Sequence, residues 1–171
     1  MNARSYGPHI VQYPKEYSLC AGCTSCEIAC SLTHDGVVGP RYNRIFLVRG
    51  TSSMIHEVAA CMHCSDHPCY EACPEQGQAM TLDANNMVRI AEEFCTGCGR
   101  CMKACVFEPA RINLVKSKVA SKRSAKKCDL CAWRAEGPAC IQYCPVRCIG
   151  LSSNPVPEYS PAVAQAPDGG Q

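Results

Sequence analysis

Cysteine is the residue type that could do chemistry in this chain, and its spacing is regular. The 171 residues include 17 cysteines, and sixteen of them form four motifs that each open with CxxC and close with CxxxC. The motifs are Cys20, Cys23, Cys26 and Cys30 (motif one); Cys61, Cys64, Cys69 and Cys73 (motif two); Cys95, Cys98, Cys101 and Cys105 (motif three); and Cys128, Cys131, Cys140 and Cys144 (motif four). CxxC steps in a tight loop let three thiolates reach three corners of one iron–sulfur cube. The spacing therefore predicts four [4Fe-4S] clusters.

The last cysteine of each motif points to a crossed arrangement. In two-cluster ferredoxins, the final cysteine of a CxxCxxCxxxC run binds the other cluster of the pair. Motifs one and three match that run, whereas motifs two and four have four and eight residues in the middle gap, which we interpret as loop insertions. Spacing alone leaves two pairings open: motif one with two and three with four, or motifs two and three nested inside one and four.

Other uses of cysteine fit the pattern less well. A disulfide framework is disfavoured because the cysteine count is odd and repeated CxxCxxC steps give poor disulfide geometry. Zinc sites of four thiolates would leave a third cysteine idle in motifs one and three. A radical enzyme that uses S-adenosylmethionine needs a CxxxCxxC triplet, which the chain lacks. Cys148 is expected to pack as a small buried side chain, and His63 and His67 to lie at the surface or in local hydrogen bonds.

Charge and composition restrict the partners. Bound thiolates and oxidised clusters would change the formal charge of +2 to about −6. A basic strip between Glu108 and Asp129 is interpreted either as a positive surface that offsets cluster charge or docks an acidic partner, or as a solvated connector. It contains Arg111, Lys116, Lys118, Lys122, Arg123, Lys126 and Lys127. Nucleic acid is not expected as a partner, because no aromatic residues are interleaved for base stacking.

Location is indicated by what the sequence lacks. No apolar stretch approaches the roughly 20 residues that a membrane span needs. The chain also shows neither a secretory signal nor a twin-arginine signal, so we expect a cytoplasmic protein.

Short strands and helices are expected between the motifs. Residues 79–93 indicate a hairpin that turns at Asn85 and Asn86, and residues 44–60 indicate a second hairpin. Residues 111–116 indicate one further strand, and the closing segment of each motif is compatible with a short helix. These elements predict an α+β fold with long loops, in which metal binding supplies much of the folding free energy.

With all four motifs in view, the chain resembles the four-cluster iron–sulfur subunits associated with the dimethyl sulfoxide reductase family and with related hydrogenases and carbon monoxide dehydrogenases. The resemblance covers residues 15–151 and rests on CAGCTSCEIAC, CMHCSDHPC followed by ACP, CTGCGRCMKAC, and KCDLC followed by CIQYCP. It implies the nested pairing. The implied ligand sets are Cys20, Cys23, Cys26 and Cys144; Cys128, Cys131, Cys140 and Cys30; Cys61, Cys64, Cys69 and Cys105; and Cys95, Cys98, Cys101 and Cys73.

The resemblance also implies two nested units like bacterial two-cluster ferredoxins. One unit would comprise residues 1–50 and 116–151, with motifs one and four. The other would comprise residues 51–115, with motifs two and three. Residues 152–171 would form a proline-rich extended tail.

Proteins of this kind relay electrons, so the resemblance implies an electron-transfer subunit without catalytic residues or a substrate site. The implied partners are a catalytic oxidoreductase subunit and a second redox partner such as a flavin subunit or a ferredoxin. A tungsten or molybdenum pterin enzyme is preferred over a hydrogenase or carbon monoxide dehydrogenase, and the small subunit of a tungsten-dependent aldehyde oxidoreductase is the preferred identity. A free-standing polyferredoxin shuttle is the alternative, and stacking of the chain with its own copies stays open.

Overall fold

The described strands form four separate two-stranded sheets, each antiparallel. The computed structural model describes residues 4–13, 19–49, 56–117 and 122–153. Its strands are β1 (Ile10–Gln12), β2 (Ile45–Arg49), β3 (His56–Ala60), β4 (Met80–Leu82), β5 (Val88–Ile90), β6 (Ile112–Lys116), β7 (Arg123–Lys127) and β8 (Ile149–Leu151). Its helices are α1 (Ser25–Asp35), α2 (Pro68–Glu71), α3 (Arg100–Lys103) and α4 (Ala139–Gln142). The result is a small ferredoxin-like fold of mixed α/β type, with short strands and few helices.

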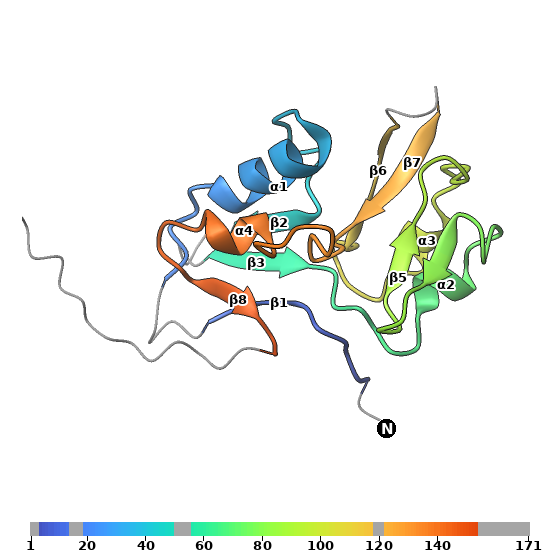
Figure 1. The fold of residues 1–171 in the computed structure, drawn as a ribbon, viewed down its shortest axis with the longest axis horizontal. Coiled ribbons are helices and arrows are strands. Elements are labelled where there is room, and N and C mark those ends of the chain that lie inside the picture. The colour runs from blue at the N-terminus through green and yellow to red at the C-terminus, as the bar shows by residue number, and fades with distance from the viewer. Residues whose placement is uncertain (1–3, 14–18, 50–55, 118–121, 154–171) are drawn as a thin grey trace, which may run out of the picture.

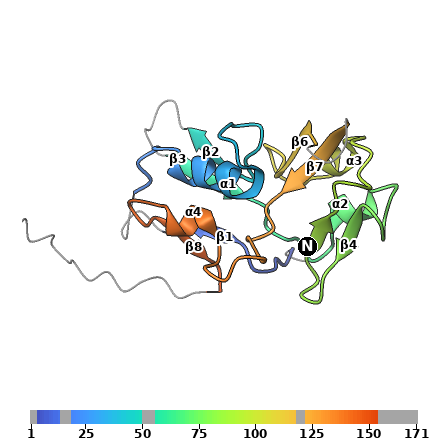
Figure 2. The same ribbon diagram turned by 45° about the horizontal axis from the view of Figure 1, so that its top comes forward.

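The elements gather into two lobes (Figure 1). We call the lobe that holds α1, α4 and the sheets β1–β8 and β2–β3 the outer lobe, and the lobe that holds α2, α3 and the hairpins β4–β5 and β6–β7 the inner lobe. Figure 2 shows the same grouping from a second direction. Because α1 and α4 carry cysteines of motifs one and four, and α2 and α3 carry cysteines of motifs two and three, each lobe contains two motifs.

Each helix carries the third cysteine of one motif. Cys26, Cys69, Cys101 and Cys140 lie in α1, α2, α3 and α4, in that order. Thr24, His67 and Gly99 have left-handed backbone angles and turn the chain from the CxxC loop into α1, α2 and α3. The last cysteine of each motif follows the third by four residues, which is the spacing of neighbours on one helix face.

Two buried clusters correspond to the two lobes. In the first, Ile10, Ile45 and Ile149 pack among the thiols of Cys26, Cys30, Cys61, Cys128, Cys140, Cys144 and Cys148. In the second, Met80, Val88 and Ile112 pack around Cys95 and Cys101. Cys148 is buried in the first cluster with its Sγ 3.7 Å from Sγ of Cys144, in agreement with the expected packing role. Aliphatic side chains and thiols, rather than aromatic rings, fill both cores.

The expected strands are confirmed, but three further strands were not predicted. β4 and β5 form the hairpin expected at residues 79–93, with Asn86 at φ 58° in its turn. β2 and β3 pair as expected, although the turn between them lies outside the described residues. β6 matches the strand expected at residues 111–116, but its partner β7 and the sheet β1–β8 were not predicted.

The expected division of the chain cuts through two of these pairs. A boundary after residue 50 separates β2 from β3, and a boundary before residue 116 divides the β6–β7 hairpin. Most of the expected tail, residues 154–171, lies outside the described residues. No helix among the described residues is long and apolar enough to cross a membrane.

The expected basic strip is divided between interior and surface. Lys126 and Lys127 in β7 are 3% and 5% exposed, so the interpretation as a solvated connector is wrong for this part. Lys116 and Arg123 are exposed, and Lys118 lies outside the described residues.

Candidate metal centre

The four cysteines Cys61, Cys64, Cys69 and Cys105 line one cavity of about 410 Å³. Three of them come from motif two, and Cys105 is the last cysteine of motif three. We call this space the motif-two cavity.

A second cavity, of about 320 Å³, is lined by Cys95, Cys98, Cys101 and Cys73. Three of these come from motif three, and Cys73 is the last cysteine of motif two. We call it the motif-three cavity. In both cavities, three thiols from one motif meet the last thiol of the other motif, which is the crossed arrangement expected within one ferredoxin-like unit.

The cysteines of motifs one and four lie together in the other lobe. Cys26, Cys30, Cys128, Cys140 and Cys144 belong to one buried cluster, with Cys20 packed against it. Cys131 is buried between Ala29 of α1 and Ala139 of α4. The structure therefore brings motif one next to motif four, although about a hundred residues separate them in the chain.

The pKa shifts of Cys26 and Cys140 show which other thiols of motifs one and four lie close to each of them. Burial raises the pKa of Cys26 to about 12, and Glu27, Cys20 and Cys144 add to the rise. Burial also raises the pKa of Cys140, and Cys128, Cys30 and Cys131 raise it further. The neighbours of Cys26 belong to the first expected ligand set, and the nearest neighbours of Cys140 belong to the second.

The same interactions connect one set of thiols to the next. The charge of Cys26 acts on Cys140, and that of Cys61 acts on Cys128. The charge of Cys69 acts on Cys101, across the two cavities of the other lobe. These interactions indicate that Cys26 lies near Cys140, Cys61 near Cys128, and Cys69 near Cys101.

Backbone amides point at four thiols, which belong to three of the four expected sets. The N–H groups of Arg44, His63, Arg111 and Ala125 donate to Sγ of Cys30, Cys61, Cys105 and Cys95 over 3.3 to 3.5 Å. Cysteines of the second, third and fourth expected sets therefore have backbone donors, and hydrogen bonds of this kind to sulfur are typical of iron–sulfur sites. Thiolate is the form that binds metal.

Buried donors without partners are concentrated at the motif-two cavity. His63 Nε2 and Arg111 Nε and Nη1 are buried and have no hydrogen-bond partner in the described chain. Both residues line this cavity. A buried donor without an acceptor is unfavourable, so the residues fit a group that brings sulfur acceptors and negative charge, as a [4Fe-4S] cluster with four thiolate ligands does. The sequence did not predict a buried His63, because its partner Lys127 lies 64 residues away.

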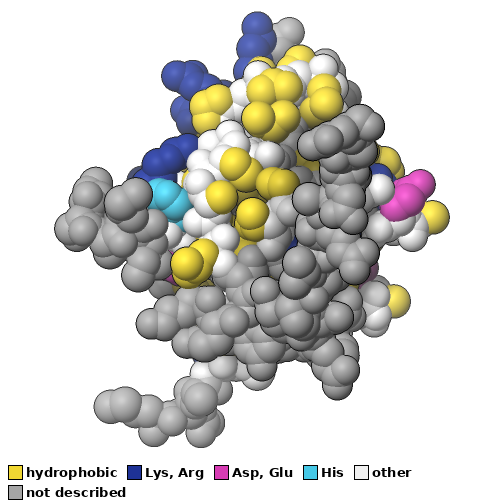
Figure 3. Space-filling view, turned by 90° about the vertical axis from the view of Figure 1, so that its left-hand side faces the viewer, with side chains coloured by type: hydrophobic (Ala, Val, Ile, Leu, Met, Phe, Trp, Pro, Cys, Tyr) yellow, Lys and Arg dark blue, Asp and Glu magenta, His cyan; other side chains and the backbone are white. Residues whose placement is uncertain are grey.

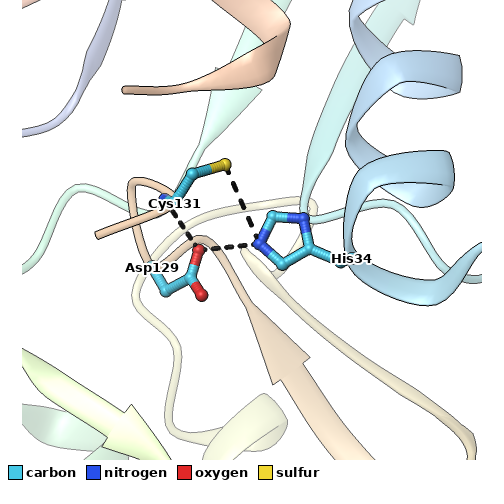
Figure 4. A group of neighbouring side chains, drawn as sticks. All are labelled: His34, Asp129 and Cys131. Atoms are coloured by element: carbon cyan, nitrogen blue, oxygen red, sulfur yellow. Dashed lines mark hydrogen bonds and ion pairs between the residues drawn. The ribbon is translucent and has the colours of Figure 1, made fainter. Parts of the chain in front are cut away.

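A second histidine lies beside the thiols of motifs one and four (Figure 4). His34 Nε2 is 2.9 Å from Asp129 Oδ1 and 3.9 Å from Cys131 Sγ, and its Nδ1 is 3.0 Å from the Cys30 carbonyl. Burial lowers the pKa of His34, but hydrogen bonds with Asp129, Cys131 and Cys30 outweigh it and raise the pKa. The three side chains could hold a metal ion by themselves, yet Cys131 belongs to motif four. Nothing in the local sequence signals His34, which joins Asp129 only through the packing of α1.

The motif cysteines differ in their exposure to solvent. Among the sixteen motif cysteines, Cys23 and Cys98 are exposed, and the other fourteen are buried or intermediate. Cys23 belongs to motif one and Cys98 to motif three. These two positions are where a partner protein can come closest to the thiols.

The model of a 4Fe-4S dicluster domain matches residues 53–154, which is more than half of the chain. The chain belongs to the 4Fe-4S dicluster domain family. The matched residues include motifs two, three and four, whereas motif one precedes them. Members of this family bind [4Fe-4S] clusters, in agreement with the chemistry expected from the cysteine spacing.

The relatives named below are an electron-transfer protein, a polyferredoxin-like subunit and an oxidoreductase. Electron transport protein HydN of Escherichia coli is 32% identical over 149 residues, covering 77% of this chain and 82% of HydN. The polyferredoxin-like subunit of aliphatic sulfonate oxidoreductase from Pyrococcus furiosus is 36% identical over 126 residues, covering 73% and 66%. The putative oxidoreductase AegA of E. coli is 33% identical over 138 residues, and the chain spans only 20% of it.

Proposed function

We propose that this dicluster-family protein is an electron-transfer subunit that carries four [4Fe-4S] clusters and has no substrate site. The proposed ligand sets are Cys20, Cys23, Cys26 and Cys144; Cys128, Cys131, Cys140 and Cys30; Cys61, Cys64, Cys69 and Cys105; and Cys95, Cys98, Cys101 and Cys73. The last two sets coincide with the thiols that line the two cavities. The first two are supported by the electrostatic neighbours of Cys26 and Cys140.

The observation that carries the proposal is the position of the two exposed thiols. Cys23 and Cys98 belong to the first and the last proposed set, and the other fourteen thiols are buried or partly buried. When bound, each cluster would accept or release one electron. The chain would hold the thiols in sequence, direct N–H groups at several of them and bury all four thiols of the second set. Because electron tunnelling slows steeply with distance, such a series allows transfer across a molecule that a single step could not cross.

The catalytic subunit is proposed to bind near Cys23. Leu19, Ile28, Leu32, Trp133 and Tyr143 are exposed large hydrophobic residues. Figure 3 views the lobe of α1 and α4 from its outer end and shows apolar side chains gathered there. Exposed apolar patches are typical of protein–protein interfaces. We retain a tungsten or molybdenum pterin enzyme as the preferred partner, with an aldehyde oxidoreductase first, and a sulfonate-type oxidoreductase joins the candidates because of the Pyrococcus relative.

The second redox partner is proposed to bind near Cys98, at a cationic groove. Arg41, Lys116, Lys122 and Arg123 line a groove of about 1300 Å³. Leu114 lines both this groove and the motif-three cavity, so the two adjoin at this residue. The described residues that line the groove include no carboxylate. A positive surface steers acidic proteins toward it, and acidic flavodoxins and ferredoxins are one-electron carriers of that type.

Iron and sulfide analysis of the anaerobically purified full chain tests the proposal. Four clusters require about sixteen irons and about sixteen sulfides per chain, and dithionite should produce paramagnetic signals from reduced clusters. About eight irons would reject the four-cluster assignment, and about four zinc ions without sulfide would reject iron–sulfur chemistry. A free-standing shuttle, the alternative, predicts that the holoprotein purifies without a large partner, whereas a subunit co-purifies with one.

A further inference from the structure

The two cavities of the inner lobe differ in charge. Besides its thiols, the motif-two cavity is lined by Lys127, Arg111 and His63, of which the first two are cations. The motif-three cavity is lined by Glu75 and Thr96 as its only side chains other than thiols that carry oxygen or nitrogen. One cavity therefore has two cations and no carboxylate among its described lining residues, and the other has a carboxylate and no cation.

Lys127 places a positive charge inside the protein without a carboxylate partner. Its side chain is at the end of β7, and Nζ donates to the carbonyl oxygens of Val88 and Cys128 over 2.9 and 3.2 Å. No ion pair among the described residues includes Lys127, whereas the adjacent Lys126 pairs with two carboxylates. A buried cation normally has an anionic partner. A cluster with four thiolate ligands in the motif-two cavity would be that partner.

Lys127 also determines which nitrogen of His63 bears the proton. Lys127 Nζ lies 3.3 Å from His63 Nδ1. An ammonium group can only donate, so Nδ1 is the acceptor and the ring hydrogen is on Nε2. His63 Nε2 is buried without a partner. The ammonium of Lys127 therefore prepares an N–H donor on a residue that lines the motif-two cavity.

Arg111 adds a second positive charge on the same cavity. Its backbone N–H donates to Cys105 Sγ over 3.3 Å, and its guanidinium lies 5.5 Å from the centre of the Phe107 ring, which also lines the cavity. Nε and Nη1 of Arg111 are buried without partners. The charge is therefore held near the cavity by packing against Phe107, and no carboxylate among the described residues pairs with it.

We propose that Lys127, His63 and Arg111 raise the reduction potential at the motif-two cavity above that at the motif-three cavity. The inference rests on the proposed function, because it requires a cluster in each cavity. Reduction adds one electron and hence one negative charge to the bound group. Nearby cations and N–H donors stabilise the reduced form more than the oxidised form, whereas Glu75 acts in the opposite direction at the other cavity. Electrons that enter near Cys98 therefore move to the buried site beside Lys127.

Potentiometric titration followed by electron paramagnetic resonance tests the proposal on the anaerobically prepared full-length holoprotein. Cys64→Ser should alter the higher-potential member of the inner-lobe pair, and Cys98→Ser the lower. Lys127→Met should lower the higher potential by at least 59 mV, which is a tenfold change in the equilibrium constant for a one-electron step. Lys127→Gln removes the charge but keeps a donor for His63 Nδ1, so its shift should be smaller than that of Lys127→Met.

Two further variants separate charge near the cavity from charge in general. Arg111→Gln should lower the same potential, and it provides a second measurement if Lys127→Met fails to fold. Lys116→Met, which removes an exposed lysine, is the matched control and should shift this potential by much less. The proposal is overturned if the Cys64→Ser variant loses the lower-potential signal, or if Arg111→Gln and Lys127→Gln leave all potentials unchanged. Iron content well below sixteen would instead overturn the proposed function.

Discussion

Asp35 is a buried carboxylate that joins the two lobes through its ion pair with Lys126. It lies at the end of α1 in the outer lobe, with its side chain 2% exposed. Arg44 Nη1 donates to its Oδ2 over 2.7 Å, and Lys126 Nζ of β7 donates to its Oδ1. Burial alone would raise the pKa of Asp35, but hydrogen bonds with Lys126 and Arg44 lower it. Asp35→Asn should therefore leave two buried cations with less negative charge to pair with.

The expected cost follows from what each cation retains. Breaking a buried ion pair by removing one partner typically costs about 3 to 5 kcal/mol. Lys126 would keep Glu92, whose Oε1 lies 2.7 Å away, whereas no ion pair of Arg44 other than that with Asp35 is found among the described residues. The lower end, about 3 kcal/mol, is therefore expected, and it corresponds to a change in equilibrium constant on the order of 100-fold.

The assay is the anaerobic rate at which the brown absorbance of the clusters is lost in denaturant. Cluster loss makes unfolding irreversible, so a rate is a better measure than an equilibrium midpoint. Asp66→Asn is the matched control, because the Arg4–Asp66 pair is at the surface, with the two side chains 32% and 51% exposed. Exposed pairs contribute less than about 1 kcal/mol. Equal rates for the two variants would refute the assignment of Asp35 as a buried connection between the lobes.

Four other perturbations have defined outcomes. The lowered pKa of Asp35 stabilises the wild type above about pH 4, the pKa of an unfolded Asp, and this stabilisation should be lost as the pH falls further. The rates of cluster loss in the wild type and in Asp35→Asn should therefore converge at low pH. Gly97→Ala should lower the cluster content, because φ is +67° and a Cβ would clash with the Arg123 carbonyl oxygen. The control Gly77→Ala, at φ +77°, has no atom near its Cβ and should lower the free energy of unfolding by only about 1 kcal/mol. The double variant Lys116→Glu/Arg123→Glu should slow reduction of an acidic flavodoxin about tenfold at low salt. The control double variant Lys103→Glu/Arg147→Glu changes two exposed positions outside the groove and should leave this rate unchanged. Removal of iron by a chelator should abolish the circular dichroism of the folded chain, and a folded apoprotein would contradict the dependence of folding on metal.

Local sequence signals explain which elements could be predicted. The β4–β5 hairpin was predictable because Asn85 and Asn86 mark its turn, and the metal chemistry because the cysteine intervals repeat. β7 could not be predicted, because Arg123–Lys127 carries three cations in five residues and looks like a solvated segment. Lys126 can be buried because it forms ion pairs with Asp35 and Glu92, which lie 91 and 34 residues away in the chain. His63 was expected at the surface for the same reason.

β7 then accounts for how the two lobes and their thiols are held in one arrangement. Successive side chains of a strand point to opposite sides, so Lys126 reaches Asp35 of the outer lobe while Lys127 reaches the motif-two cavity. The N–H of Ala125 donates to Cys95 of motif three, and Cys128 of motif four follows the strand directly. Four consecutive residues thus touch both lobes and cysteines of three proposed ligand sets. A substitution that tilts β7 should therefore disturb the spacing between sites before it removes any ligand, and a loss of electron transfer at unchanged iron content would be the sign of it.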